Sequence, residues 1–391
     1  MSDPFEVWRL ACSTAFTRSL ELLGDVFAPY AALSPPQDSY AIDLSSFPTF
    51  QRVRLDLDTM FLLEPRRSTA SARPVVIVGP YAVHDAAIAD FAEGHSLAGA
   101  LTEEGAGPLA LTFWKSATAQ MRDYGIDAYL SDLNVAVDDL GGRVSLVGIC
   151  QGGWLAAAYA ARFPRKVEKL VVAAAPLDPG AAESHITRTL AATPPAAIAR
   201  ALALTGGRVS GTMSSALFGD NWSPEFNAEA ALQGADVSTV QKFDVWNSRT
   251  VDLPGVYFAQ TAEWIFRENR LANGSFPALG REVGLAEIVA PIFALAASDD
   301  AVVTPPQATA RSSRNAAERR SPSASSPGGT CRCSWAAARS EPPGGTSRIG
   351  SAKSALQAQR QRTRRREGTR CHARRPSSCC HSRHGHKRPS L

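Results

Sequence analysis

Cysteine is scarce in the first 310 residues of this 391-residue chain, which hold only Cys12 and Cys150. Two cysteines so far apart do not make a disulfide framework. Long apolar runs are also lacking: no uninterrupted stretch reaches the roughly 18 residues that would indicate a membrane span. The first residues include early acids and lack a basic start that leads into an apolar stretch, which argues against a secretory signal. We therefore expect a cytoplasmic protein.

Acidic residues are scarce at the other end of the chain. Residues 311–391 contain 19 Lys and Arg, three Glu and no Asp, and Trp335 is their only aromatic residue. Residues 1–310 contain 22 Lys and Arg against 34 Asp and Glu. The net charge of +4 therefore averages an acidic part and a basic tail. We expect a globular fold before residue 311 and a disordered tail over 311–391.

The basic tail allows two functional interpretations. It contains Cys331, Cys333 and two Cys-His groups at 371–372 and 379–381, but this spacing matches no zinc finger and no apolar core surrounds it. Its arginines would attract nucleic acid or anionic lipid, yet no nucleic-acid-binding module is recognisable. We expect no metal, no cofactor and no specific nucleic-acid partner.

Apolar runs and helical patterns alternate after a helical N-terminal segment, residues 1–50. The pattern predicts strands at 53–57, 74–79, 109–113, 144–147 and 167–175, and helices at 86–101, 126–140 and 151–163. This alternation indicates an α/β fold with a parallel, doubly wound sheet, whose first part covers 51–178. Residues 179–288, interrupted by Pro and Gly, are typical of an inserted cap and include a helix at 262–271. A core strand at 292–297, within segment 289–310, returns to the sheet.

Cys150 lies in the most informative stretch, Gly-Ile-Cys-Gln-Gly-Gly at 148–153. This stretch joins the strand at 144–147 to the helix at 151–163. In α/β-hydrolases the nucleophile lies on such a strained turn, and the glycines, here Gly148, Gly152 and Gly153, avoid clashes with the adjacent strand and helix. The helix N-terminus is expected to lower the pKa of the thiol and so to favour the thiolate. The alternative is a buried structural cysteine on a glycine-rich turn.

Two aspartates, Asp299 and Asp300, follow the strand at 292–297. In this fold the acid that orients the catalytic histidine lies in such a strand-end turn, downstream of the nucleophile. Asp299 is our choice because it lies nearest the strand end, and Asp300 stays open. The alternative is an aspartate that caps a helix starting near Pro305.

These features together resemble the polyhydroxyalkanoate synthases and the related intracellular polyhydroxyalkanoate depolymerases. Residues 144–153 are similar to the lipase-like box of this family, in which Cys replaces Ser, and residues 268–299 follow its pattern between cap and catalytic Asp. The segment His95–Leu97 is similar to the one after the first buried strand. The resemblance covers residues 74–308, and its specific part is the Cys box followed by two glycines.

The resemblance implies a triad and an oxyanion hole. Cys150 would be the nucleophile and Asp299 the orienting acid. The backbone N–H of Gln151 would be one oxyanion donor, and a second would come from the loop at 80–84, where we choose Tyr81.

The resemblance also implies the substrates. A synthase transfers the acyl group of a 3-hydroxyacyl-coenzyme A thioester to a growing polyester. One alternative is a polyester depolymerase, or another ester or thioester hydrolase. The other is an inactive protein that binds polyhydroxyalkanoate granules. Association with granules and formation of a homodimer are left open.

The chain departs from the family in two places. Residues 112–115, Thr-Phe-Trp-Lys, stand where many synthases have Asp-Trp-Gly. No histidine follows the aspartates before the basic tail, since His84, His95 and His185 all precede them.

The tail itself suggests why the histidine is missing. Read in a shifted frame, residues 330–335 spell His-Val-x-Leu-Phe-Met-Gly, which resembles the catalytic-histidine segment of the family. We expect that the reading frame changed near residue 311. The last strand and last helix of the fold would then be missing, and the strand at 292–297 would be an exposed sheet edge.

Overall fold

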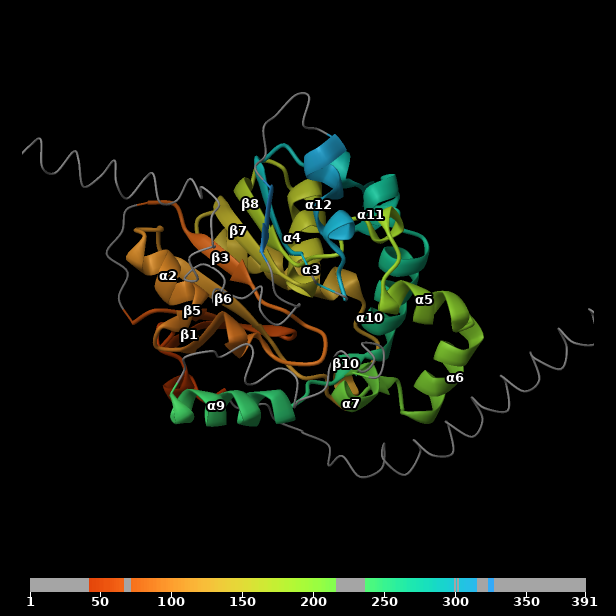
Figure 1. The fold of residues 1–391 in the computed structure, drawn as a ribbon, viewed down its shortest axis with the longest axis horizontal. Helices are drawn as coiled ribbons and strands as arrows, with labels where there is room; N and C mark the ends of the chain where they lie inside the picture. The colour runs from red at the N-terminus through yellow and green to blue at the C-terminus, as the bar shows by residue number, and fades with distance from the viewer. Residues whose placement is uncertain are drawn as a thin grey trace, which may run out of the picture. The chain divides into compact units, whose positions relative to one another are not determined.

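One eight-stranded sheet forms the centre of the protein (Figure 1). The computed structural model describes residues 42–66, 72–215, 236–298, 300, 302–314 and 323–326. The strands, in spatial order, are β1 (Arg52–Asp56), β2 (Met60–Glu64), β6 (Leu109–Trp114), β3 (Val75–Val78), β7 (Val144–Ile149), β8 (Val167–Ala173), β13 (Ile292–Ala297) and β14 (Ser323–Ser326). β1, β2 and β6 pair antiparallel, and every pair from β6 to β14 is parallel. The predicted doubly wound, mostly parallel sheet is confirmed.

Successive side chains of the central strands enter two different cores. In β3, Val76 and Val78 belong to one apolar cluster and Ile77 to the other. The first cluster includes residues of α3 (Ile126–Asp139) and α4 (Gln151–Arg162), and the second includes residues of η2 (Ala86–Ala89) and α2 (Leu97–Glu103). Because strand side chains alternate, both faces of the sheet are buried, and the strands consist of nearly continuous apolar residues.

The prediction of a single helix over residues 86–101 is wrong. Between η2 and α2 the chain forms a short hairpin of β4 (Asp90–Ala92) and β5 (His95–Ser96). The cause is Asp90, a fully buried carboxylate that accepts hydrogen bonds from the backbone N–H groups of Thr49 and Phe50 and from the Ser96 hydroxyl. A buried charge needs several such partners, and a continuous helix would not supply them.

The prediction that the last strand is missing is also wrong. β14 pairs in parallel with β13, with Ala294 opposite Ser323 and Ala297 opposite Ser326. Its sequence is only Ser and Ala, so the pairing rests on the backbone, which an open edge strand offers to any extended segment. α12 (Pro305–Arg314) likewise continues past residue 311. The prediction that the last helix is also missing falls on the rest of the tail, which lies outside the described residues.

Short elements make up the segment between β8 and β13, where the sequence predicts the cap, and we use that name for the segment. They are η4 (Pro179–Ala181), α5 (His185–Ala192), α6 (Pro195–Leu204), β9 (Arg208–Val209), α7 (Gly211–Ser215), α9 (Val237–Ser248), β10 (Leu253–Pro254), α10 (Gly255–Gln260), the π-helix η6 (Thr261–Arg267), α11 (Arg270–Asn273), β11 (Phe276–Ala278), β12 (Arg281–Val283) and η7 (Leu285–Glu287). α5, α6, α7 and α10 gather on the side of the sheet away from α2 (Figure 1). The predicted helical segment at 1–50 falls mostly outside the described residues. None of the helices that the structure describes is both long and apolar enough to cross a membrane.

Candidate active site

Cys150 lies at a strained turn between β7 and α4. Its φ is 51° and its ψ is −121°, a backbone conformation that side chains other than glycine rarely adopt. Its backbone N–H donates to the Ala173 carbonyl at 2.8 Å, and its carbonyl accepts from Gly153 N at 2.9 Å. These bonds hold the strained residue at the end of the sheet, as in a nucleophile elbow.

Glycine is required on both sides of this cysteine. A Cβ at Gly152 would lie 2.2 Å from the Val78 carbonyl oxygen, and a Cβ at Gly148 would lie 2.5 Å from Cα of Gly153. Neither neighbour is a flexible side chain that could move aside. The close approach brings the first turn of α4 against β3 and fixes the direction of the Cys150 side chain.

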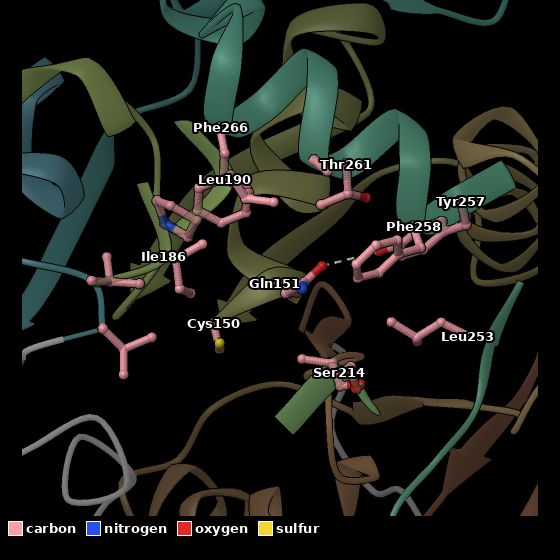
Figure 2. Close-up of a pocket in the computed structure, with 15 residues that line it drawn as sticks. Cys150, Gln151, Ile186, Leu190, Ser214, Leu253, Tyr257, Phe258, Thr261 and Phe266 are labelled. Atoms are coloured by element: carbon pink, nitrogen blue, oxygen red, sulfur yellow. Dashed lines mark hydrogen bonds between the residues drawn. The ribbon is translucent and has the colours of Figure 1, made fainter. Parts of the chain in front are cut away.

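The Cys150 thiol faces an apolar cavity between the sheet and the cap (Figure 2). The lining comprises Ala82, Cys150, Gln151, Pro176, Ile186, Leu190, Ser214, Leu253, Tyr257, Phe258, Thr261, Ala262, Phe266, Val302 and Val303. Most of the apolar residues come from α5, α10 and η6 of the cap. A cavity with this apolar lining suits an apolar acyl group rather than a charged one.

Burial raises the pKa of the Cys150 thiol to about 12. The backbone N–H of Gln151 stabilises the thiolate and opposes this rise, while the negative charge of Asp300 adds to it. The expectation that the helix N-terminus lowers this pKa is therefore wrong, because the loss of solvation outweighs the favourable N–H group.

A pH dependence of Cys150 alkylation follows from the raised pKa. The thiolate is the reactive form, and its fraction grows about tenfold per pH unit as long as the pH is below the pKa. We expect the rate of iodoacetamide labelling of Cys150, measured by peptide mass mapping, to rise about tenfold with each pH unit between pH 7 and pH 9.5. The labelling rate of a small thiol in solution, whose pKa is near 8.5, should level off within this pH range. A plateau for Cys150 below pH 9 would contradict the raised pKa.

The predicted oxyanion residues lie in different surroundings. The backbone N–H of Gln151 interacts with the Cys150 thiol. The side chain of Tyr81 instead lies in the core, where its hydroxyl accepts from Tyr129 at 3.0 Å and donates to the Asp252 carbonyl at 3.3 Å. Ala82, next along the loop, lines the cavity. A backbone donor from this loop stays a prediction, and the Tyr81 side chain does not point into the cavity.

Of the two candidate acids, Asp299 lies outside the described residues. Asp300 is 4% exposed, and its Oδ1 accepts from the backbone N–H groups of Val302 and Val303, at 2.9 Å each. These two valines line the cavity, and the Asp300 charge acts on the Cys150 thiol. The sequence favours Asp299 because it lies nearest the strand end, and that choice stays a prediction.

No histidine lines this cavity within the described residues. Nδ1 of His84 lies 2.7 Å from the Arg249 carbonyl, and its ring packs on Trp246 with 4.6 Å between centroids. Burial lowers the pKa of His84, so it is neutral at pH 7. His185 begins α5, whose Ile186 reaches the cavity. In the same described part, no group of three His, Cys, Asp or Glu side chains could hold a metal ion.

Comparison with known proteins gives a family and one curated relative. A family model described as alpha/beta hydrolase fold matches residues 108–321, more than half of the chain. A poly(3-hydroxyalkanoate) polymerase subunit PhaC from Synechocystis is 38% identical over 112 residues, which are 27% of this chain and 29% of that protein.

Solved structures are similar at lower identity. A bromoperoxidase from Bacillus anthracis is 18% identical with a TM-score of 0.43, covering 70% of this chain and 89% of its own. An epoxide hydrolase from Bacillus megaterium is 12% identical with a TM-score of 0.45, covering 72% of this chain and 94% of its own.

Proposed function

Because the chain belongs to the alpha/beta hydrolase family, we propose that it transfers acyl groups through Cys150, with 3-hydroxyacyl-coenzyme A thioesters as the acyl donors. The observation that carries the proposal is the thiol at a strained strand-to-helix turn, open to an apolar cavity. Partial similarity to a poly(3-hydroxyalkanoate) polymerase subunit supports the choice of acyl group.

The reaction has two steps. Sγ of Cys150 attacks the thioester carbonyl, and the C–S bond to coenzyme A breaks, so that an acyl-cysteine forms and the coenzyme A thiol leaves with the proton of Cys150. The backbone N–H of Gln151 stabilises the oxyanion of this step. The 3-hydroxyl of another acyl unit then attacks the acyl-cysteine, gives up its proton to the Cys150 sulfur and extends the ester.

Asp300 is the acid we assign to this site. It is buried, it acts on the thiol, and its Oδ1 is fixed by two backbone N–H groups. Its role would be to orient a histidine that accepts the proton of the attacking group, as aspartates do in triads of this fold. Such a histidine does not lie in the cavity within the described residues.

A hydrolase is the second candidate, because the same acyl-cysteine yields a free acid when water attacks it. This alternative includes a polyester depolymerase. Its support is the family itself, since the fold is typical of hydrolases as well as acyltransferases. A granule-binding protein without turnover would use the same apolar cap surfaces but form no acyl-cysteine.

Incubation with 3-hydroxybutyryl-coenzyme A distinguishes these functions. We expect release of coenzyme A, an acyl adduct located on Cys150 by peptide mass mapping, and ester-linked oligomers among the products. A Cys12→Ala variant is the matched control and should form the same adduct. Free 3-hydroxybutyrate without oligomers would favour the hydrolase, and granule binding without any adduct would rule out both enzymes.

A further inference from the structure

Three polar side chains interrupt the apolar lining on one side of the cavity. They are the carboxamide of Gln151, the phenol of Tyr257 and the hydroxyl of Thr261. The Tyr257 hydroxyl donates to Oε1 of Gln151 at 3.5 Å, and Figure 2 shows Gln151 between Cys150 and Tyr257. The opposite side, formed by Ile186, Leu190 and Phe266, is apolar.

The hydrogen-bonding capacity of this polar side is not fully used within the described residues. Oγ1 of Thr261 is buried and reaches no partner at hydrogen-bond geometry there, although it lies close enough to the Tyr257 phenol to oppose the rise in the pKa of that phenol. The bond from Tyr257 to Gln151 is long for an O–H···O contact. By contrast, the Ser214 hydroxyl, elsewhere in the lining, already donates to the Gly211 carbonyl at 3.0 Å. Buried polar groups usually have partners, so polar atoms without one in a cavity next to a nucleophile are suited to a ligand.

Packing holds the phenol in place. The Tyr257 ring lies against those of Tyr129, Tyr81 and Trp154, with centroids 4.5, 5.3 and 6.3 Å apart. Thr261 follows Tyr257 by four residues across the junction of α10 and η6, so the two side chains share a helix face. Burial raises the pKa of Tyr257 well above its ordinary value, so its hydroxyl keeps its proton and remains able to donate.

We propose that Gln151, Tyr257 and Thr261 form the site that recognises the 3-hydroxyl group of the acyl substrate. The inference rests on the proposed function: these residues determine which acyl groups the same cavity accepts. When the carbonyl carbon is at Cys150, the hydroxyl of the substrate lies two carbons further along the acyl chain. It then faces the side of the cavity that Gln151 and Tyr257 form. The alkyl end of the acyl group then packs against Ile186 and Leu190.

The physical basis of the selectivity is the cost of unpaired polar groups. A 3-hydroxyacyl group donates and accepts hydrogen bonds at this place, whereas the matching unsubstituted acyl group would bury Thr261 and Tyr257 against methylene carbons. Sites built to bind a substrate hydroxyl reject the analogue without it far more strongly than apolar pockets reject a size difference.

The test compares acylation of Cys150 by 3-hydroxybutyryl-coenzyme A and by butyryl-coenzyme A, followed as intact mass over time. We expect the wild-type chain to prefer the hydroxylated thioester by at least about tenfold. Tyr257→Phe and Thr261→Val should each reduce this preference severalfold, by slowing the hydroxylated substrate and by removing the unpaired hydroxyl that disfavours the butyryl group. Both changes remove a hydroxyl and keep the shape, and circular dichroism melting verifies that each variant folds.

Tyr159→Phe is the matched control, because it removes a tyrosine hydroxyl that lies outside the cavity and donates a hydrogen bond to Asn134. It should leave the preference unchanged. Equal acylation by both thioesters, or an unchanged preference in both cavity variants, would overturn the recognition site while the acyl-transfer function stands. Absence of any adduct from either thioester would instead overturn the proposed function, and this inference with it.

Discussion

A serine in place of Cys150 is expected to form the acyl adduct at least about 10³-fold more slowly, since an alcohol ionises several pKa units above a thiol and each unit lowers the ionised fraction about tenfold. The cavity lining supplies no histidine within the described residues that could compensate by taking the proton. Although the pKa of the Cys150 thiol is about 12, a small fraction of it is thiolate, and sulfur is more nucleophilic than the oxygen of serine.

The measurement is the rate of adduct formation from 3-hydroxybutyryl-coenzyme A, followed by intact mass. Cys150→Ala gives the background, because alanine keeps the turn but has no nucleophile. If Cys150→Ser is acylated within about tenfold of the natural chain, a general base is in place, because such bases contribute roughly 10²–10⁴-fold. That result would show that the cavity has a base other than the residues that line it in the described part of the chain.

The central sheet could be predicted from the sequence because its strands are short, buried and apolar. The strand predicted at 292–297 has the observed bounds of β13, and the run at 74–79 contains β3. β2 was missed, although Met60–Glu64 is mostly buried. Its pairing with β6 is antiparallel and joins residues distant in sequence, so a local pattern of alternating strands and helices does not reveal it.

The parts of the site that could not be predicted depend on tertiary burial. The sequence shows that Cys150 precedes a helix, which favours the thiolate, but the burial that raises its pKa is a property of the folded chain. Gln151 was predicted for its backbone N–H alone. Its side chain, at the start of α4, lies beside Tyr257 and Thr261 of the cap, which are more than 100 residues further along the chain.

β14 shows a different limit. The basic tail lacks the apolar residues that normally mark a buried strand, and residues 323–326 have no pattern that predicts one. The partner, β13, supplies the reason for pairing: its edge offers N–H and C=O groups that need bonds. Backbone pairing of this kind requires only an extended segment without bulky side chains.

Restoring the shifted reading frame from codon 311 is expected to raise turnover of 3-hydroxybutyryl-coenzyme A by roughly 10²–10⁴-fold, the usual contribution of a general base. The shifted frame places a histidine near residue 330, after the acid, which is the order of nucleophile, acid and base in this fold. Acyl-cysteine formation should gain less than chain extension. In the second step the attacking group is an alcohol, which is far less acidic than a thiol, and it needs a positioned base to take its proton.

The comparison follows coenzyme A release and ester products for the chain as it stands, for the frame-restored chain, and for the restored chain with that histidine changed to glutamine. Gain and then loss of turnover would show that the base comes from this segment. The glutamine version is the matched control, because it keeps the rest of the frame-restored segment and removes only the imidazole. If the present chain already turns over as fast as the restored one, the base lies before residue 311. His84→Gln and His185→Gln then identify it. Since Nδ1 of His84 lies 2.7 Å from the Arg249 carbonyl, a loss of turnover in His84→Gln would assign the base to its other ring nitrogen, Nε2.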